Sequence, residues 1–236
     1  ATEEINARSD EYWMRVMDIA TKFKLPRMKR CGTIMGRGEE DDLSTAQILY
    51  PAMQCADIFF LKADICQLGM DQRKVNMLAR EYCDMAKPKI RFKPVILSHP
   101  MLMGLKVGQE KMSKSDPASA IFMEDTAAEV NTKIKKAHCA PGEVAKNPVL
   151  NWVRHVVFGK FSEFTVKREE SEGGSITYHS ADEVDADFAA GRLHPKPLKD
   201  ALARELNAML EPVRKHFSSG KPAQLLKRVK AFRTTR

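Results

Sequence analysis

The chain has 236 residues, 43% of them apolar and 30% charged, which is typical of a globular protein with one substantial core or two modest ones. No apolar run approaches the roughly 18 residues of a membrane-spanning helix, and the first residues lack the pattern of a secretory signal. The five cysteines have no CxxC spacing, which disfavours a disulfide framework or a zinc ribbon. These features predict a cytoplasmic protein with no membrane partner. The formal net charge of +8, concentrated in the C-terminal half, suits a polyanionic partner.

The first predicted element is an amphipathic helix over residues 9–24, which Pro26 ends. Its apolar stripe comprises Trp13, Val16, Met17 and Ala20. After a charged loop, a second helix is expected from Ser44, because the segment up to Gln47 has the capping-box pattern. This helix should continue to about Leu61.

A strand–helix–strand unit follows. Residues 63–69 alternate in hydrophobicity and predict a buried strand, Asp71 is expected to cap a helix that runs to about Cys83, and residues 94–98 predict another strand. This order favours a parallel sheet covered by helices.

The remainder is mostly helical in pattern. Thr126 begins a second capping box, and a Gly-Gly pair at 173–174 separates two β-like runs, which predicts a hairpin. Composition changes after Pro117, so we place a domain boundary near residue 120, with one domain over residues 1–120 and a helical one over 121–236.

Within the second helix, Tyr50, Gln54 and Asp57 stand at i, i+4 and i+7 and therefore share one face. Their neighbours are strongly apolar, and buried polar groups without partners cost about 1–3 kcal/mol each. A small polar ligand is one candidate partner. The alternative is a core helix, kinked at Pro51, whose polar residues satisfy one another.

Two further segments favour a nucleotide. Gly69, Asp71 and Gln72 lie at a strand-to-helix turn, where ligands bind in open α/β folds, although Asp is also a common helix cap. The pentad Lys111-Met112-Ser113-Lys114-Ser115 lies in a predicted loop, where two lysines can hold a polyphosphate, although a solvated Lys/Ser loop is common.

Taken together, these segments resemble a known family. Residues 111–115 are identical to the KMSKS motif of class I aminoacyl-tRNA synthetases, and residues 50–57 and 67–73 closely resemble the tyrosyl-tRNA synthetases of eukaryotic and archaeal type. The resemblance extends to residues 31–36, 193–195 and 210–214. It implies an α/β fold, in which the C-terminal part of a Rossmann-like catalytic domain precedes a helical anticodon-binding domain.

The resemblance also implies roles for the tyrosine substrate. Tyr50 and Gln54 would hold its amino group, Gln72 would lie by its carboxylate, and Asp57 would accept its phenolic proton. Phenylalanine would leave that carboxylate unpaired, and tyrosyl synthetases are themselves the standard example of such discrimination without editing.

For the nucleotide, the resemblance implies that Gly69 and Asp71 contact the adenylate ribose. Lys111 and Lys114 would bind the ATP phosphates with Ser115 assisting, and Met112 and Ser113 belong to the same nucleotide-binding loop. The implied substrates are tyrosine, ATP with Mg²⁺, and tRNA(Tyr), without a protein-bound metal, and the implied assembly is a homodimer or pseudo-dimer. Positioning and charge stabilisation would dominate the two in-line transfer steps.

The sequence departs from the family pattern in two respects. It contains no HIGH-like tetrapeptide, so we expect the chain to begin inside the connecting insertion of the catalytic domain and not to catalyse alone. Glu172 stands where some tyrosyl enzymes have an aromatic residue that stacks on the anticodon, and a carboxylate cannot replace stacking worth roughly 1–3 kcal/mol per base.

Three alternatives stay open at this point. A tryptophanyl synthetase shares similar turn and loop motifs, but the phenol, amide and carboxylate at 50, 54 and 57 match the tyrosyl pattern better. A non-catalytic tRNA-binding fragment would retain the helices and the charge. An unrelated nucleotide-binding protein would have to carry the KMSKS pentad by coincidence.

Overall fold

The computed structural model describes residues 2–35, 41–113 and 116–232, and it divides into two compact units. Unit 1 spans Ala1–Met101 and unit 2 spans Leu102–Arg236. The division lies before the predicted boundary near residue 120. Leu102, Leu105 and Met112 pack with the core of unit 2, which explains why the segment before residue 120 belongs to that unit.

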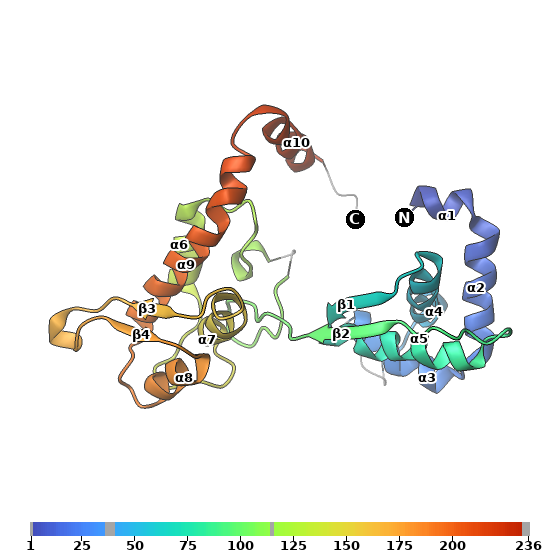
Figure 1. Cartoon of the computed structure of the whole chain (residues 1–236), viewed down its shortest axis with the longest axis horizontal. Helices are drawn as coiled ribbons and strands as arrows, with labels where there is room; N and C mark the ends of the chain where they lie inside the picture. The colour runs from blue at the N-terminus through green and yellow to red at the C-terminus, as the bar shows by residue number, and fades with distance from the viewer. Residues whose placement is uncertain (1, 36–40, 114–115, 233–236) are drawn as a thin grey trace. The chain divides into compact units, whose positions relative to one another are not determined.

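Unit 1 combines helices with a small parallel sheet (Figure 1). In chain order its elements are α1 (Thr2–Ala7), α2 (Ser9–Lys22), α3 (Leu25–Lys29), η1 (Arg30–Met35), α4 (Thr45–Phe60), β1 (Ile65–Gly69), η2 (Met70–Gln72), α5 (Arg73–Met85) and β2 (Val95–His99). The prediction of helices at the positions of α2 and α4 is confirmed. The predicted capping box of α4 is also confirmed: Ser44 N donates to Gln47 Oε1 at 2.9 Å, and Gln47 N donates to Ser44 Oγ.

The core of unit 1 lies between α2 and α4. The predicted stripe of α2 is only partly right, because Val16 is buried but Trp13 and Met17 are 42% and 48% exposed. The buried residues of α2 are Tyr12, Val16 and Ile19. This set also has helical spacing, so periodicity alone permits either stripe to be buried. In the structure the ring of Tyr12 packs against Phe60, and the stripe that contains Tyr12 is the buried one.

Strands β1 and β2 pair in parallel, with Ile65 opposite Val95 and Gly69 opposite His99, so the predicted parallel arrangement is confirmed. The prediction that β1 is buried is wrong, because Cys66 is its one buried residue. Asp71 is not the cap of α5 either. A short 3-10 turn, η2, lies between β1 and α5, so α5 begins only at Arg73. The N-cap residue of α5 is Gln72, and its side chain makes no capping hydrogen bond.

Unit 2 is mostly helical and contains one hairpin (Figure 1). Its elements are η3 (Pro117–Ser119), α6 (Ala127–Lys136), α7 (Pro148–Trp152), the π-helical turn η4 (Val153–Val157), β3 (Phe164–Val166), η5 (Glu170–Glu172), β4 (Ile176–Tyr178), α8 (Ala181–Ala189), α9 (Pro195–His216) and α10 (Gly220–Lys230). In the part of the chain that the structure describes, no helix is both long and apolar enough to span a bilayer.

Both local predictions for unit 2 are confirmed. Thr126 and Glu129 form a capping box at α6, and β3 and β4 pair antiparallel. Gly173 and Gly174 have φ values of 90° and 69°, a left-handed backbone that favours glycine and turns the chain between the strands. Helices α6 and α9 pack side by side over a core that includes Ile134 and Leu202 (Figure 1).

Candidate functional site

The three polar residues of α4 lie along one face of the helix, as their spacing predicts. Tyr50 is 46% exposed, whereas Gln54 and Asp57 are half-buried. Helix α4 runs uninterrupted through the buried Pro51, so this face spans two full turns of one rigid element.

Gln54 connects this face to the turn after β1. Its Nε2 donates to Oε1 of Gln72 at 2.9 Å, a bond between residues 18 apart in sequence. The partner therefore comes from η2 and not from a neighbour on α4. The hydrogen bond holds the amide of the helix face and the amide of the turn together, as a shared binding site requires.

Asp57 receives its partner from a third element. The phenol of Tyr12, on α2, donates to Asp57 Oδ1 at 2.9 Å, and the oxygen of that phenol lies 3.4 Å from the carbonyl oxygen of Met53. Burial raises the pKa of the Asp57 carboxyl, and the bond from Tyr12 opposes that rise. Burial also raises the pKa of Tyr12, which keeps the phenol a donor.

Tyr12 contacts the candidate site and is absent from the residues that the sequence predicts for it. The signal that could have found it is the alternative stripe of α2, formed by Tyr12, Val16 and Ile19, which places a phenol among buried apolar residues. A buried tyrosine hydroxyl usually has a hydrogen-bond partner. That expectation identifies the need for an acceptor, but not that Asp57 supplies it.

Gly69 is the last residue of β1, and its backbone lies close to the side chains of Met101 and Asp71. A Cβ added there would lie 2.5 Å from Met101 Sδ and 2.9 Å from Asp71 Oδ1, both closer than van der Waals contact allows. Glycine thus lets the Asp71 carboxylate fold back over the end of the strand. Together with Gln72, these residues form a polar turn at the carboxyl end of β1, as the sequence predicts.

The basic loop belongs to unit 2, and its base is held by an ion pair. Lys106 Nζ lies 2.8 and 2.7 Å from the two carboxylate oxygens of Asp116, and Gln109 Nε2 donates to Asp116 Oδ2 at 3.3 Å. The ammonium of Lys106 lowers the pKa of Asp116 below its ordinary value. The two anchors of the loop, residues 106 and 116, therefore lie side by side.

Of the pentad itself, Lys111 is exposed, Ser113 is half-buried and Met112 packs against the core of unit 2. Lys114 and Ser115 lie outside the described residues. Gly104 supports the fold of the loop, since a Cβ there would lie 2.5 Å from Gln109 Oε1 and 3.1 Å from the carbonyl oxygen of Lys111. The base of the loop also borders a cavity of about 410 Å³ that Lys106, Pro117 and Phe122 help to line.

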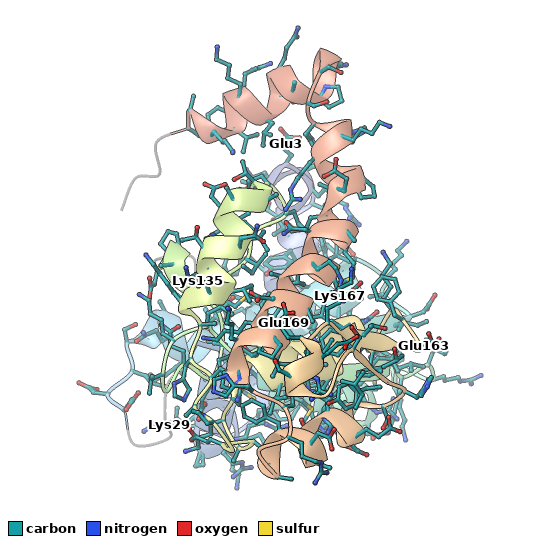
Figure 2. All side chains as sticks on the ribbon, turned by 90° about the vertical axis from the view of Figure 1, so that its left-hand side faces the viewer. Glu3, Lys29, Lys135, Glu163, Lys167 and Glu169 are labelled. Carbon is teal, nitrogen blue, oxygen red and sulfur yellow. The ribbon has the colours of Figure 1, made fainter. Side chains whose placement is uncertain are left out.

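Unit 2 also carries a charged cavity beside the hairpin. It has a volume of about 410 Å³, and its lining includes the cations Lys167, Arg168 and Lys196 beside the carboxylates Glu169 and Asp200. Arg168 holds the hairpin by donating to the carbonyl oxygens of Gly174 and Arg192. Figure 2 labels Lys167 and, on α6, Lys135, which are both exposed. The side chain of Glu172 lies outside the described part.

Among the described residues, no cluster of three or more His, Cys, Asp or Glu side chains could hold a metal ion. All five cysteines are buried and free. Burial raises the pKa of Cys31, Cys66 and Cys139, which makes these thiols less reactive.

Comparisons with known proteins identify the family of the chain. The family model "tRNA synthetases class I (W and Y)" matches residues 4–211. The tyrosine–tRNA ligase of Thermococcus sibiricus is 41% identical over 98% of this chain and 68% of its own length. The tyrosyl-tRNA synthetase of Pyrococcus horikoshii, solved in complex with L-tyrosine, is 38% identical with a TM-score of 0.85, over 96% of this chain and 67% of that one.

A plant relative is closer in sequence. Tyrosine–tRNA ligase 1, cytoplasmic, of Arabidopsis thaliana is 61% identical over the whole of this chain, which spans 61% of the length of that relative. The matched family model, the identities and the shared fold lead to one conclusion: the chain belongs to the tyrosine–tRNA ligases among the class I aminoacyl-tRNA synthetases.

Proposed function

We propose that this chain supplies part of the active site of a tyrosine–tRNA ligase. The observation that carries the proposal is the polar face of α4, whose Asp57 and Gln54 are held by Tyr12 and Gln72 from two other elements. Tyr50 and Gln54 hold the amino group of tyrosine, Gln72 lies by its carboxylate, and Asp57 accepts its phenolic proton.

Two segments are proposed to bind the nucleotide, the turn after β1 in unit 1 and the basic loop in unit 2. Gly69 and Asp71 contact the ribose, and the close approach of the backbone at Gly69 supports this role. Lys111 and Lys114, with Met112, Ser113 and Ser115 of the same loop, bind the phosphates of ATP. Mg²⁺ arrives with ATP and shields the phosphate charge.

Two transfers follow. A carboxylate oxygen of tyrosine attacks the α-phosphorus of ATP, and pyrophosphate leaves with the electron pair of the broken P–O bond. A terminal ribose hydroxyl of tRNA(Tyr) then attacks the carbonyl carbon of the adenylate, and AMP leaves. The chain contributes by holding the reacting groups in line and by stabilising charge on the leaving phosphate oxygens.

The helical part over residues 121–236 is proposed to bind the anticodon region of the tRNA. The excess of cations in the lining of the cavity beside the hairpin, Lys167, Arg168 and Lys196 against Glu169 and Asp200, supports this role, because cations neutralise phosphates. The names of the relatives further support a cytoplasmic enzyme, and the family resemblance supports a dimer or pseudo-dimer. A tRNA-binding fragment without catalysis is the second candidate, favoured by the net charge of +8.

Calorimetry tests the proposal. Tyrosine, phenylalanine and tryptophan would be titrated into the chain by itself and then into a hybrid, termed the joined protein, in which the chain is joined to the part of the Arabidopsis relative that it does not cover. We expect the joined protein to bind tyrosine and to prefer it over the other two. Tighter binding of tryptophan would contradict the amino-acid assignment, and tRNA binding without any amino-acid binding would favour the second candidate.

A further inference from the structure

We propose that Tyr12 is a positioning residue for amino-acid specificity. It orients the Asp57 carboxylate so that the remaining lone pairs of that group accept a hydrogen bond from the phenolic hydroxyl of the substrate. The inference rests on the proposed function and adds to it a residue from a different helix. Tyr12 touches no substrate atom in this proposal and acts through Asp57.

The contacts of Tyr12 fix its hydroxyl closely. The side chain is 2% exposed, and its ring packs edge-on against Phe60, with centroids 5.3 Å apart at 81°. Its oxygen lies 2.9 Å from Asp57 Oδ1 and 3.4 Å from the carbonyl oxygen of Met53, one turn earlier on α4. A buried ring held in this way leaves the hydroxyl little freedom, so the acceptor carboxylate is also held.

The charge state of Asp57 gives this bond its importance. A phenolic O–H is bound best by an ionised carboxylate, which accepts up to about four hydrogen bonds. Partial burial favours the neutral acid, and a donor such as Tyr12 favours the ion. Tyr12 therefore both aims the carboxylate and helps to keep it charged, while leaving acceptor capacity for a second phenol.

Two other tyrosine–aspartate bonds show what distinguishes this one. Tyr82 donates to Asp18 at 2.7 Å, and Tyr178 donates to Asp187 at 3.0 Å. Each of those aspartates also pairs with a cation, Asp18 with Lys22 and Asp187 with Arg192.

Asp57 differs in its charge environment. In the described part of the chain, no salt bridge involves this residue. The pairs at Asp18 and Asp187 are neutralised within the protein, as structural contacts are. The pair at Asp57 keeps an unneutralised acceptor on the same helix face as Tyr50 and Gln54, as a site for a neutral hydroxyl requires.

The first experiment compares Tyr12→Phe with the matched control Tyr82→Phe, which removes the same hydroxyl from a bond outside the site. In the joined protein, kcat/KM for ATP–pyrophosphate exchange would be measured with tyrosine and with phenylalanine. We expect Tyr12→Phe to lower the value for tyrosine about tenfold and to leave the value for phenylalanine nearly unchanged, because only tyrosine uses the carboxylate. Tyr82→Phe should change neither.

An equal loss for both amino acids would mean that Tyr12 is merely structural, and an unchanged value for tyrosine would overturn the proposal. A wild-type joined protein that does not prefer tyrosine would instead overturn the proposed function, and this inference with it.

The second experiment uses the chain by itself and needs no activity. The side-chain carboxyl carbon of Asp57 would be titrated by NMR in the wild type, Tyr12→Phe and Tyr82→Phe. Loss of the donor should raise the pKa of Asp57 in Tyr12→Phe, because the hydrogen bond stabilises the ionised form, and Tyr82→Phe should leave it unchanged. An unchanged pKa in Tyr12→Phe would show that the bond does not orient Asp57, whatever the enzyme's substrate.

Discussion

The polar face of α4 and the basic loop of unit 2 are built in contrasting ways. On the α4 face, the hydrogen bonds of Asp57 and Gln54 reach partners 45 and 18 residues away in sequence. In the basic loop, the contacts of Asp116 reach only 10 and 7 residues, to Lys106 and Gln109. The face is therefore fixed by the packing of several elements, whereas the loop is closed by local, partly exposed contacts.

This difference matches the tasks that we propose for the two regions. Distinguishing a phenol from a benzyl group requires an acceptor held in one place, and such an acceptor must be supported by packed neighbours. Binding the phosphates of ATP requires positive charge that can approach the substrate and withdraw from it. A loop whose base is closed by local contacts suits this task, because it can change conformation without opening a hydrophobic core. The predictions below test whether the two regions separate in this way.

The largest expected effect is in the loop. Lys111→Ala in the joined protein should slow adenylate formation between about a hundredfold and a thousandfold, because a cation that stabilises the leaving phosphate is lost. Tyrosine affinity should stay nearly the same, since the face is built separately. Single-turnover kinetics and calorimetry measure the two quantities, with Lys24→Ala as the control, because Lys24 is an exposed lysine that precedes α3 in unit 1. A large loss of tyrosine affinity would instead make the loop structural.

The next effect concerns the face. Asp57→Asn should lower the preference for tyrosine over phenylalanine by roughly tenfold to a hundredfold, because a hydrogen bond to a charged group is replaced by one to a neutral amide. Competition between the two amino acids in ATP–pyrophosphate exchange measures this preference. The change should leave the maximal rate of adenylate formation with saturating tyrosine much less affected than Lys111→Ala does. Unchanged selectivity would remove Asp57 from its proposed role.

The smallest effect is at the base of the loop. Lys106 lowers the pKa of Asp116, so this pair stabilises the folded state above the unfolded pKa of about 3.9, and the contribution is lost as pH falls through the lower folded pKa. Asp116→Asn should remove this pH dependence of the folded state's stability. It should also speed amide exchange at Gly104 and Leu105 by roughly two- to fivefold, as expected for a partly exposed ion pair. Protection of these amides, taken relative to the intrinsic exchange rate at each pH, that rises in the variant or still falls below pH 4 as in the wild type would contradict this account.

Local chemistry made much of the fold predictable. The capping boxes at Ser44 and Thr126 and the hairpin at Gly173 depend on side chains within a few residues of the backbone groups that they serve, so the sequence predicts them correctly. The face of α4 follows from helical spacing alone.

What the sequence does not reveal depends on distant contacts. Tyr12 and Trp13 both have helical neighbours at suitable spacing, and packing against α4 decides which of them is buried. Asp71 has the chemistry of a cap, but the short turn η2 moves the helix start past it. The partner of Asp57 could not be predicted for the same reason, since no local rule connects residues 12 and 57.

The sheet of unit 1 has a practical consequence for work with this chain. Ile65, Val95 and Leu97 are between 46% and 61% exposed on two strands that, among the described residues, pair only with each other. Apolar strands with open backbone edges are templates onto which further strands add. Concentrated solutions of the chain alone should therefore form β-rich oligomers, and a complementary segment that covers these strands should keep it monodisperse.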